Sequence, residues 1–430
     1  MKFRFNILFF LLNLISIIAE GQTTWNLSYN SYQGNPVPLG SVRPMEWNNH
    51  YFIFHRTVIS GTRPSAFIKK VSSNGILVDE LESDSIVFLS NRQLVGITAI
   101  MDTALGIPRI NLVASAKRNS KVIFYRLSYD VNLNFMEVDS LVCMQCSSVS
   151  DLYFGDIAKI SSDVYLISGV NRIGFNGIVK LDFITGITTS YLAGIDPFDF
   201  LLFPFKIKIN DTLFYGGTDY YPHKLRFFDQ NLNSTPHLEQ RFQPIPTSIP
   251  NIPCQAIPLK SERLLRSSQF LSFSFSDTAR VGLLIQDRLG NNVDSLSIPS
   301  LQGSWFEFGI VDYLDTSAIF LGASQKLGFS SNPQNSHIEV HKVGLNRQKH
   351  WSVSLGRRPG YEILQIKATT DGGVLVYTRY FDQGVWFHEL RKLDGQGNFL
   401  SQSEFPLQKA FSIYPNPAQS ADVFFVDIAP

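Results

Sequence analysis

The chain has 430 residues, of which 44% are hydrophobic, 13% aromatic and 17% charged, and its formal net charge is +1. This composition indicates an ordered chain with a large core and excludes an intrinsically disordered protein. The nearly neutral balance argues against nucleic acid as a partner, and three cysteines are too few for a disulfide scaffold.

The N-terminal segment MKFRFNILFFLLNLISIIAEGQTTW has the parts of a secretory signal peptide. Two basic residues precede an apolar run over about residues 7–19, and small residues follow at Ala19 and Gly21. This pattern predicts a signal peptide over 1–21 with cleavage before Gln22. The alternative is an uncleaved membrane anchor, but the run is shorter than the roughly 20 apolar residues that a span needs. We therefore expect an exported protein, secreted or at the cell surface, without a membrane span after cleavage.

After this leader, short runs of alternating apolar residues are separated by Gly, Asn, Asp and Pro, and helical periodicity is nearly absent. A strand followed by a turn recurs at intervals of about 50 residues. The residues that anchor the repeat are Lys70, Arg126, Lys180, Phe227, Ile285, Lys342 and Lys392. The final unit predicts strands at 363–369, 373–380, 385–393 and 398–405, with the turn KLDGQGN between the third and the fourth.

Seven units of four strands predict an all-β fold, a seven-bladed β-propeller over residues 40–409, with each anchor in the third strand of its blade. One unit cannot bury both faces of its sheet alone, whereas packing the units around an axis buries them. The competing fold is a pair of β-sandwich domains, which would not require such a repeat. The final unit resembles the DGG…KLD…GN repeat of secreted bacterial propeller proteins.

The segment 22–39 lies outside the seven units and contains TTWNLSYN, which is similar to KHWSVSLG in the sixth unit. One interpretation is that this strand completes the last blade and closes the ring. The other is a leader strand packed on an outer edge. The sequence leaves both open.

The C-terminal segment 410–430 begins a new unit, and its motif is formed by Tyr414, Pro415, Asn416, Pro417 and Ala418. It resembles the start of the C-terminal sorting domain of type IX secretion substrates from Bacteroidetes. The resemblance implies the type IX secretion machinery as a partner. The sorting domain of that family has several strands, whereas this chain contains one, DVFFVDI, so the resemblance is to a truncated domain. The alternative is an ordinary proline-rich linker.

We find no catalytic or phosphate-binding motif, and we expect no cofactor and no metal. Cys143 and Cys146 form a C-x-x-C without the second ligand pair that zinc requires, which leaves a local disulfide or two loop thiols. His337 and His341 are four residues apart. In a strand this spacing puts both on one sheet face, which favours a structural or surface role.

In a propeller the loops between second and third strands all fall on one rim. The basic and aromatic residues that the sequence places there are Arg63, Lys117, Arg118, Arg172, Arg280 and Lys326, with Phe175, Tyr220, Tyr221 and Phe381. They predict a rim that binds an anionic or sugar-containing polymer. The alternative is an ordinary solvated rim, because exposed loops carry charge in most proteins.

These observations predict an exported or cell-surface β-propeller that acts as a binding or scaffold module, with extracellular glycans or proteins as candidate partners. A carbohydrate-active enzyme, a glycoside hydrolase or lyase, is the first alternative, with Asp219 and Asp382 as a candidate acid and base. A structural module of a larger surface assembly is the second. Convergent carboxylates at the axis would favour the enzyme.

Overall fold

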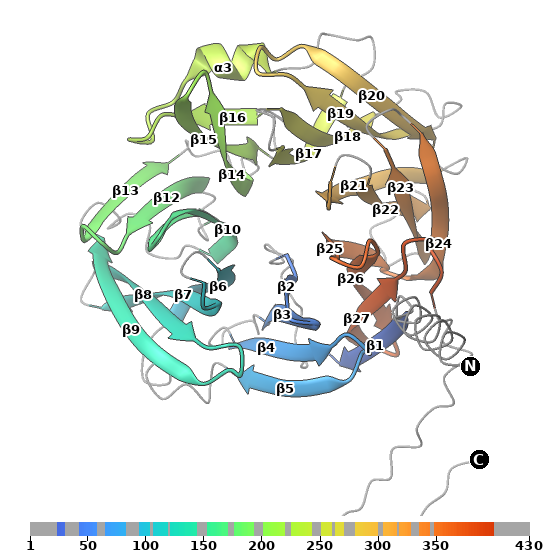
Figure 1. Ribbon diagram of the computed structural model, residues 1–430, viewed down its shortest axis with the longest axis horizontal. Helices are drawn as coiled ribbons and strands as arrows, with labels where there is room; N and C mark the ends of the chain where they lie inside the picture. Colours follow the sequence, from blue (N-terminus) through green and yellow to red (C-terminus); the bar gives the residue numbers. More distant parts are fainter. Residues whose placement is uncertain are drawn as a thin grey trace, which may run out of the picture.

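The computed structural model describes residues 24–30, 43–57, 65–82, 94–103, 106–118, 121–143, 153–170, 176–192, 201–219, 225–242, 251–259, 263–270, 280–299, 304–315, 318–327, 335–344 and 348–399. Their strands form seven antiparallel sheets, arranged as blades around a central axis (Figure 1). The predicted seven-bladed β-propeller is confirmed. The predicted signal peptide and the sorting motif at Tyr414–Ala418 lie outside the described residues.

The first three blades follow one another along the chain, each with its first strand innermost. Blade 1 consists of β2 (Met45–Trp47), β3 (His50–Thr57), β4 (Ser65–Ser72) and β5 (Leu77–Glu82). Blade 2 consists of β6 (Leu94–Asp102), β7 (Arg109–Arg118), β8 (Lys121–Tyr129) and β9 (Phe135–Cys143). Blade 3 consists of β10 (Tyr153–Ser161), β11 (Val164–Val170), β12 (Asn176–Asp182) and β13 (Ile187–Leu192).

The remaining blades complete the ring. Blade 4 consists of β14 (Leu201–Ile209), β15 (Thr212–Asp219), β16 (Leu225–Phe228) and the helix α3 (Pro236–Arg241). Blade 5 consists of β17 (Asn251–Pro258), β18 (Leu264–Phe270), β19 (Arg280–Gln286) and β20 (Asn292–Pro299). Blade 6 consists of β21 (Ser304–Tyr313), β22 (Ile319–Leu327), β23 (Asn335–Val343) and β24 (Lys349–Pro359). Blade 7 consists of β25 (Glu362–Ala368), β26 (Val374–Asp382), β27 (Val385–Leu393) and β1 (Trp25–Asn30).

All seven repeat anchors lie in the third strand of a blade, as predicted. The repeat was readable because the turn after this strand uses the same chemistry in several blades. An aspartate accepts hydrogen bonds from the backbone N–H groups two and four residues later and from the asparagine side chain four residues later, at 2.8–3.0 Å. These turns begin at Asp130, Asp229, Asp287 and Asp394.

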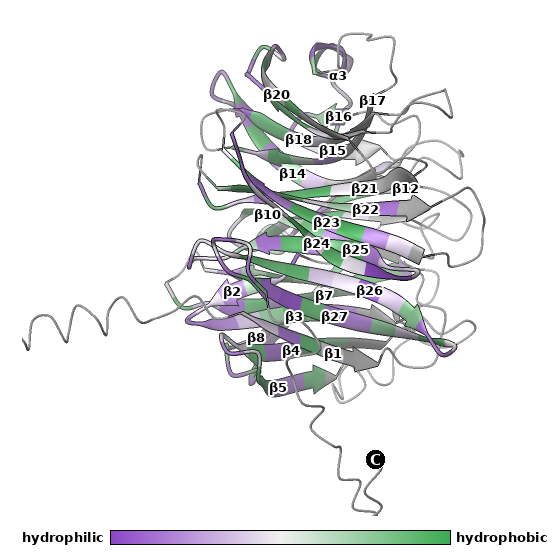
Figure 2. Ribbon diagram, turned by 90° about the vertical axis from the view of Figure 1, so that its right-hand side faces the viewer, coloured by the Kyte–Doolittle hydropathy of each residue, from purple (hydrophilic) through white to green (hydrophobic). Residues whose placement is uncertain are grey.

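The core lies between the blades rather than within any one of them. Each pair of neighbouring blades shares a cluster of buried apolar side chains, including the pair formed by blades 7 and 1. In β23, for example, Ile338 and Val340 belong to the cluster shared with blade 7, and Val343 belongs to the cluster shared with blade 5. Because both faces of a blade are covered, hydrophobic residues are spread along the strands (Figure 2).

Blade 4 departs from the predicted four strands. Its outer position is taken by α3, which contacts β16. Pro236 at the first turn favours the helix start, and Leu238 and Phe242 are buried against the blade. The rings of Phe242 and Phe227 stack with their centroids 5.0 Å apart. The sequence-based prediction was wrong here because a single helical turn is too short to show a periodic pattern.

The ring closes through its N-terminal strand. β1 pairs with β27 in an antiparallel ladder, with Trp25 opposite Lys392. Of the two interpretations of segment 22–39, the structure therefore supports closure of the last blade. It also corrects one prediction, because the position beside β27 assigned to a strand at 398–405 is occupied by β1. Local pattern cannot decide which of two segments takes an edge.

The similarity between TTWNLSYN and KHWSVSLG reflects equivalent positions in space. Trp25 of β1 and Trp351 of β24 each lie opposite the third-strand anchor of their own blade. Each indole N–H donates to a backbone carbonyl in the turn of the following blade, Ser73 at 2.6 Å and Gly395 at 2.9 Å. A tryptophan thus joins both pairs of blades: Trp351 links blade 6 to blade 7, and Trp25 links blade 7 to blade 1.

A glycine in the receiving turn makes room for each indole. Gly75 and Gly397 have positive φ values of 80° and 85°, and a Cβ there would lie 2.7 Å and 2.9 Å from the rings of Trp25 and Trp351. In blades 2 and 4 a leucine with positive φ takes the same turn position and is buried, at Leu133 and Leu232, whereas in blade 5 Gly290 takes it and lies against Arg241. The residue at this turn position therefore depends on the side chain that packs against it from the neighbouring blade.

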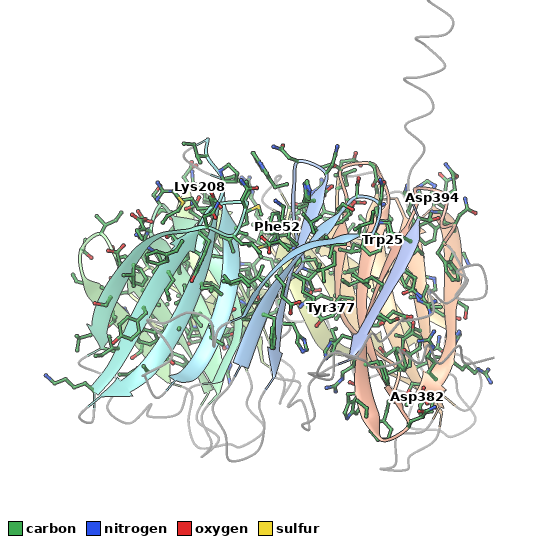
Figure 3. The ribbon with its side chains drawn as sticks, turned by 90° about the horizontal axis from the view of Figure 1, so that it is seen from below. Trp25, Phe52, Lys208, Tyr377, Asp382 and Asp394 are labelled. Atoms are coloured by element: carbon green, nitrogen blue, oxygen red, sulfur yellow. The ribbon has the colours of Figure 1, made fainter. Side chains whose placement is uncertain are left out.

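The two rims differ in construction. One carries the tight turns just described, and Lys208 and Asp394 lie on it (Figure 3). The other carries the connections between second and third strands and between successive blades, and Asp382 lies on it (Figure 3). Cys143 at the end of β9 is disulfide-bonded. No helix within the described part of the chain is long and apolar enough to span a membrane.

Candidate binding site on the rim of blade 7

The predicted basic rim is described only in part. Lys117 and Arg118 end β7, Arg280 begins β19 and Lys326 lies near the end of β22, so their backbones reach one rim from three blades. Their side chains are outside the description, as are the whole residues Arg63, Arg172, Phe175, Tyr220 and Tyr221. Their joint role in binding stays a prediction.

Blade 7 provides the described part of this rim, the hairpin of β26 and β27. Gln383 and Gly384 connect the strands with φ values of 46° and 82°, the pattern of a tight two-residue hairpin. Phe381 therefore lies directly opposite Trp386, and their ring centroids are 5.4 Å apart. Asp382 is exposed at the tip, while Phe381 and Trp386 are partly exposed. Sequence reasoning placed Phe381 and Asp382 on the rim but missed Trp386.

An arginine packs against the tryptophan. The guanidinium carbon of Arg379 lies 4.5 Å from the Trp386 ring centroid, a cation–π contact. Glu362, opposite Arg379 in the ladder, accepts a hydrogen bond from its Nε at 2.7 Å. The carboxylate fixes the guanidinium plane, and the guanidinium in turn supports the indole. We call Glu362, Arg379, Phe381, Asp382 and Trp386 the blade 7 platform.

A second arginine supports the strands beneath the platform. Arg358 of β24 lies 4.3 Å from the ring centroid of Tyr380, which stacks on Phe387 at 5.3 Å. Arg358 also pairs with the buried carboxylate of Glu389 at 3.2 Å. The platform is therefore carried by a rigid polar network that joins blades 6 and 7.

Glu389 is the centre of this network. It accepts hydrogen bonds from Arg391 at 3.1 Å and from the Tyr361 hydroxyl at 2.8 Å. Burial alone would raise the pKa of the Glu389 carboxyl, but Arg391 and Arg358 outweigh burial and hold that pKa below its usual value. Glu389 is therefore ionised at neutral pH and serves structure rather than proton transfer.

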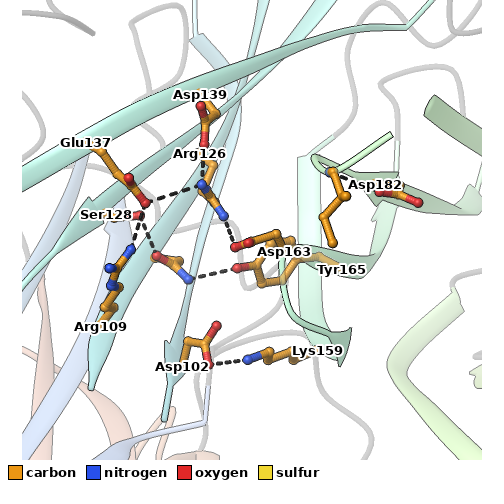
Figure 4. Close-up of polar contacts among 12 residues, drawn as sticks. Asp102, Arg109, Arg126, Ser128, Glu137, Asp139, Lys159, Asp163, Tyr165 and Asp182 are labelled. Atoms are coloured by element: carbon orange, nitrogen blue, oxygen red, sulfur yellow. Dashed lines mark hydrogen bonds and ion pairs between the residues drawn. The ribbon is translucent and has the colours of Figure 1, made fainter. Parts of the chain in front are cut away.

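A different charged cluster joins blades 2 and 3 (Figure 4). The buried guanidinium of Arg126 pairs with Asp139 on its own blade and with Asp163 on the next. Arg126 also lies 5.4 Å from the Phe183 ring centroid. Since the arginine is already paired by three carboxylates, with Glu137 as the third at 3.4 Å, this cluster joins the blades rather than presenting a charge to a ligand.

The innermost strands carry charged residues near the axis. Asp312 of β21 accepts a hydrogen bond from Arg43 at 3.1 Å and pairs with Lys367 of β25 at 3.5 Å. On the other side of the ring, burial raises the pKa of Asp156 in β10 to about 6, and a hydrogen bond from Ile157 and the charge of Arg43 oppose the shift. An acid that is partly protonated near neutral pH is the kind of group that general acid catalysis uses.

Asp219, Asp382, His337 and His341 are the remaining residues that the sequence suggests as catalytic or metal-ligating. Asp219 ends β15 in blade 4 and Asp382 ends β26 in blade 7, so both strands finish on the same rim. His337 and His341 lie on one face of β23, as predicted, and both are buried. Within the described ranges, no group of three or more His, Cys, Asp or Glu side chains could hold a metal ion.

Comparison with known proteins shows no family for this chain. No family model and no curated protein matches the sequence. Raptor from Chaetomium thermophilum is similar at 10% identity with a TM-score of 0.46, over 86% of this chain and 29% of that one. The polysaccharide lyase Uly1 is similar at 9% identity with a TM-score of 0.42, over 85% of this chain and 92% of that one. The S. cerevisiae core factor is similar at 10% identity with a TM-score of 0.45, over 86% and 61%.

These similarities concern the fold alone. This chain spans less than a third of the Raptor chain that it matches. Propellers carry both binding and catalytic functions, so the function has to be inferred from the site.

Proposed function

We propose that this protein is an exported β-propeller that binds extracellular glycans through the rim to which the blade 7 platform belongs. The observation that carries the proposal is the partly exposed Trp386, which packs against Arg379 and lies beside Phe381 at a hairpin tip. Aromatic rings supply rigid apolar area at low entropic cost, and the apolar face of a sugar ring packs against such area.

The polar residues of the blade 7 platform can form hydrogen bonds with the hydroxyl groups of a sugar. Asp382 is exposed and accepts hydrogen bonds from hydroxyl groups, and the Arg379–Glu362 pair offers both donors and acceptors. Pockets that bind small ligands combine apolar walls with a few fixed polar groups in the same way. Export rests on the sequence features of residues 1–21, and recognition by the type IX machinery rests on the resemblance at Tyr414–Ala418.

The test is a polysaccharide and glycan array with the full chain, followed by titration calorimetry on any hit. Trp386→Ala should weaken binding by about tenfold or more, because a buried aromatic contact contributes roughly 1.4 kcal/mol or more. Phe135→Ala is the matched control, since Phe135 is a 55% exposed aromatic on β9 of blade 2. Equal loss in both variants, or no loss in Trp386→Ala, would refute the proposal.

A carbohydrate-active enzyme is the second candidate, and one observation favours it. Burial raises the pKa of Asp156 to about 6, whereas Asp312 is paired with Arg43 and Lys367, so the two inner-strand carboxyls have different environments. Incubation of an array hit with the protein should then release reducing sugar, and Asp156→Asn should stop the release. A ligand that is bound but never cleaved excludes this candidate and leaves the binding module in place.

A further inference from the structure

A line of polar side chains crosses the outer half of blade 6. His337, Glu339 and His341 alternate along β23 and share one face, because Ile338 and Val340 between them face blade 7. In the ladder with β24, Glu339 lies opposite Ser354 and His341 lies opposite Ser352. Both serines are exposed on the outermost strand, while the two imidazoles behind them are buried.

A hydrogen bond in this line connects a serine to a histidine, and a carboxylate lies beyond the histidine at a longer distance. His337 Nε2 lies 2.6 Å from Ser354 Oγ, and His337 Nδ1 lies 3.9 Å from Glu339 Oε1. Burial raises the pKa of the Glu339 carboxyl above its usual value, and the neighbouring side chain of Gln325 opposes that shift. Nε2 toward a serine hydroxyl and Nδ1 toward a carboxylate is the orientation that nucleophilic serine catalysis requires.

Two further groups lie near the Ser354–His337 pair. The backbone N–H of Gly356 donates to Ser354 Oγ at 3.2 Å, at a point where β24 bulges and Gly356 has a φ of 96°. Arg357, the next residue, is opposite His337 in the ladder. Backbone N–H groups and guanidinium groups are the types of donor that stabilise a developing oxyanion.

We propose that Ser354 is the nucleophile of an esterase site, with His337 as its general base and Glu339 as the residue that orients the imidazole. The substrate class is a carboxylic ester whose acyl carbon can reach the exposed hydroxyl of Ser354. Gly356 N–H holds Ser354 Oγ in place, and Arg357 stabilises the oxyanion of the tetrahedral intermediate.

The reaction consists of two balanced steps. Ser354 Oγ attacks the carbonyl carbon while its proton passes to His337 Nε2, and the C–O bond of the ester breaks as His337 returns that proton to the leaving alcohol. A water molecule then gives a proton to His337 and attacks the acyl carbon. The carboxylic acid leaves, and Ser354 Oγ takes the proton back from His337. No metal, oxidant or cofactor enters either step.

The second pair in the line, Ser352 and His341, is less suited to the reaction. His341 presents Nδ1 rather than Nε2 to its serine, at 2.8 Å, and is only 1% exposed. Burial and the charge of Lys349 lower the pKa of His341 to about 4, which makes it a weak base. The pKa of His337 is also lowered, by burial and by Arg357, so this imidazole is neutral at pH 7 and able to accept the proton.

The site is tested with a fluorophosphonate probe on the full chain, followed by peptide mass spectrometry, and by hydrolysis of p-nitrophenyl acetate. We expect the probe to modify Ser354. Ser354→Ala should lose both labelling and hydrolysis, and His337→Gln should slow hydrolysis by about 100-fold or more. Ser140→Ala is the control and should behave as wild type, because Ser140 is an exposed serine on the outermost strand of blade 2.

Two results would overturn the inference: no labelling of Ser354, or labelling and hydrolysis that persist in His337→Gln. Modification of Ser352 instead would overturn the assignment of the nucleophile. Since Ser354 is exposed, Ser354→Ala is expected to fold, which an unchanged far-UV circular dichroism spectrum verifies. The inference does not depend on glycan binding, because the array result and the labelling result are separate measurements.

Discussion

Replacing Trp25 by alanine should open the ring at its seam. The side chain is 3% exposed, contacts Gly75, and donates to the Ser73 carbonyl across the junction between blades 7 and 1. A buried tryptophan removes about 150–250 Å² from water, or about 4–6 kcal/mol at 25 cal/mol per Å², as an upper bound. Measured core Trp→Ala changes cost about 3–5 kcal/mol. We expect a loss in that range, measured by urea unfolding followed by far-UV circular dichroism.

Two variants isolate the cause. Trp25→Phe keeps most of the apolar contact and loses the N–H donor, so it should cost about 1–2 kcal/mol. Trp351→Ala removes the equivalent indole from blade 6, whose outer strand is covalently linked to blade 7 through residues 360–361. Only Trp25→Ala should accelerate hydrogen exchange in both β1 and β27. Equal exchange in the two alanine variants, or a loss below about 1 kcal/mol for Trp25→Ala, would contradict the role of Trp25 in closure.

Two further predictions concern buried ionisable groups of blade 7. His388 is buried, and its pKa lies well below 6.5 because of burial and then of the neighbouring charges of His55 and Arg379. Below about pH 6.5 the unfolded chain therefore binds a proton at this histidine that the folded chain does not, so the free energy of unfolding should fall as the pH is lowered further. His388→Gln should reduce the slope of melting temperature against pH between 6.5 and 4.5. An unchanged slope would contradict this. Glu389→Ala leaves the buried Arg391 without its carboxylate and should cost about 3–5 kcal/mol in chemical denaturation, whereas a cost near zero would show that the arginine finds other partners.

The sequence was sufficient for the blade count because the repeat is encoded locally. Asp394 and its equivalents close their turns with hydrogen bonds to residues at most four positions away, so the motif is visible in a short window. The outermost positions were not predictable in the same way. The sequence pattern allows either β1 or the segment 398–405 beside β27, and the choice depends on contacts between residues such as Trp25 and Ser73 on another blade.

The candidate sites also divide into features that are encoded locally and features that depend on contacts between distant segments. Phe381 and Asp382 were placed on the rim because strand order alone fixes which end of a strand a loop joins. Trp386 was missed, although its signal was present: two aromatics flanking a Gln-Gly turn predict a hairpin with an aromatic pair at its tip. The pairing of His337 with Ser354 depends on the register and bulge of β24, which alternation does not reveal.

Closure through β1 also sets the order in which the molecule can be completed. β1, at residues 25–30, pairs with β27, which lies at residues 385–393. Such a contact has a sequence separation close to the length of the domain, which makes it slow to form and places it late in folding. A chain emerging from a ribosome or a membrane pore would therefore remain an open arc, with the edge of β27 unpaired, until nearly all blades are through. Proteolysis of nascent chains truncated before residue 385 should then cut throughout the arc, whereas chains ending after residue 399 should resist.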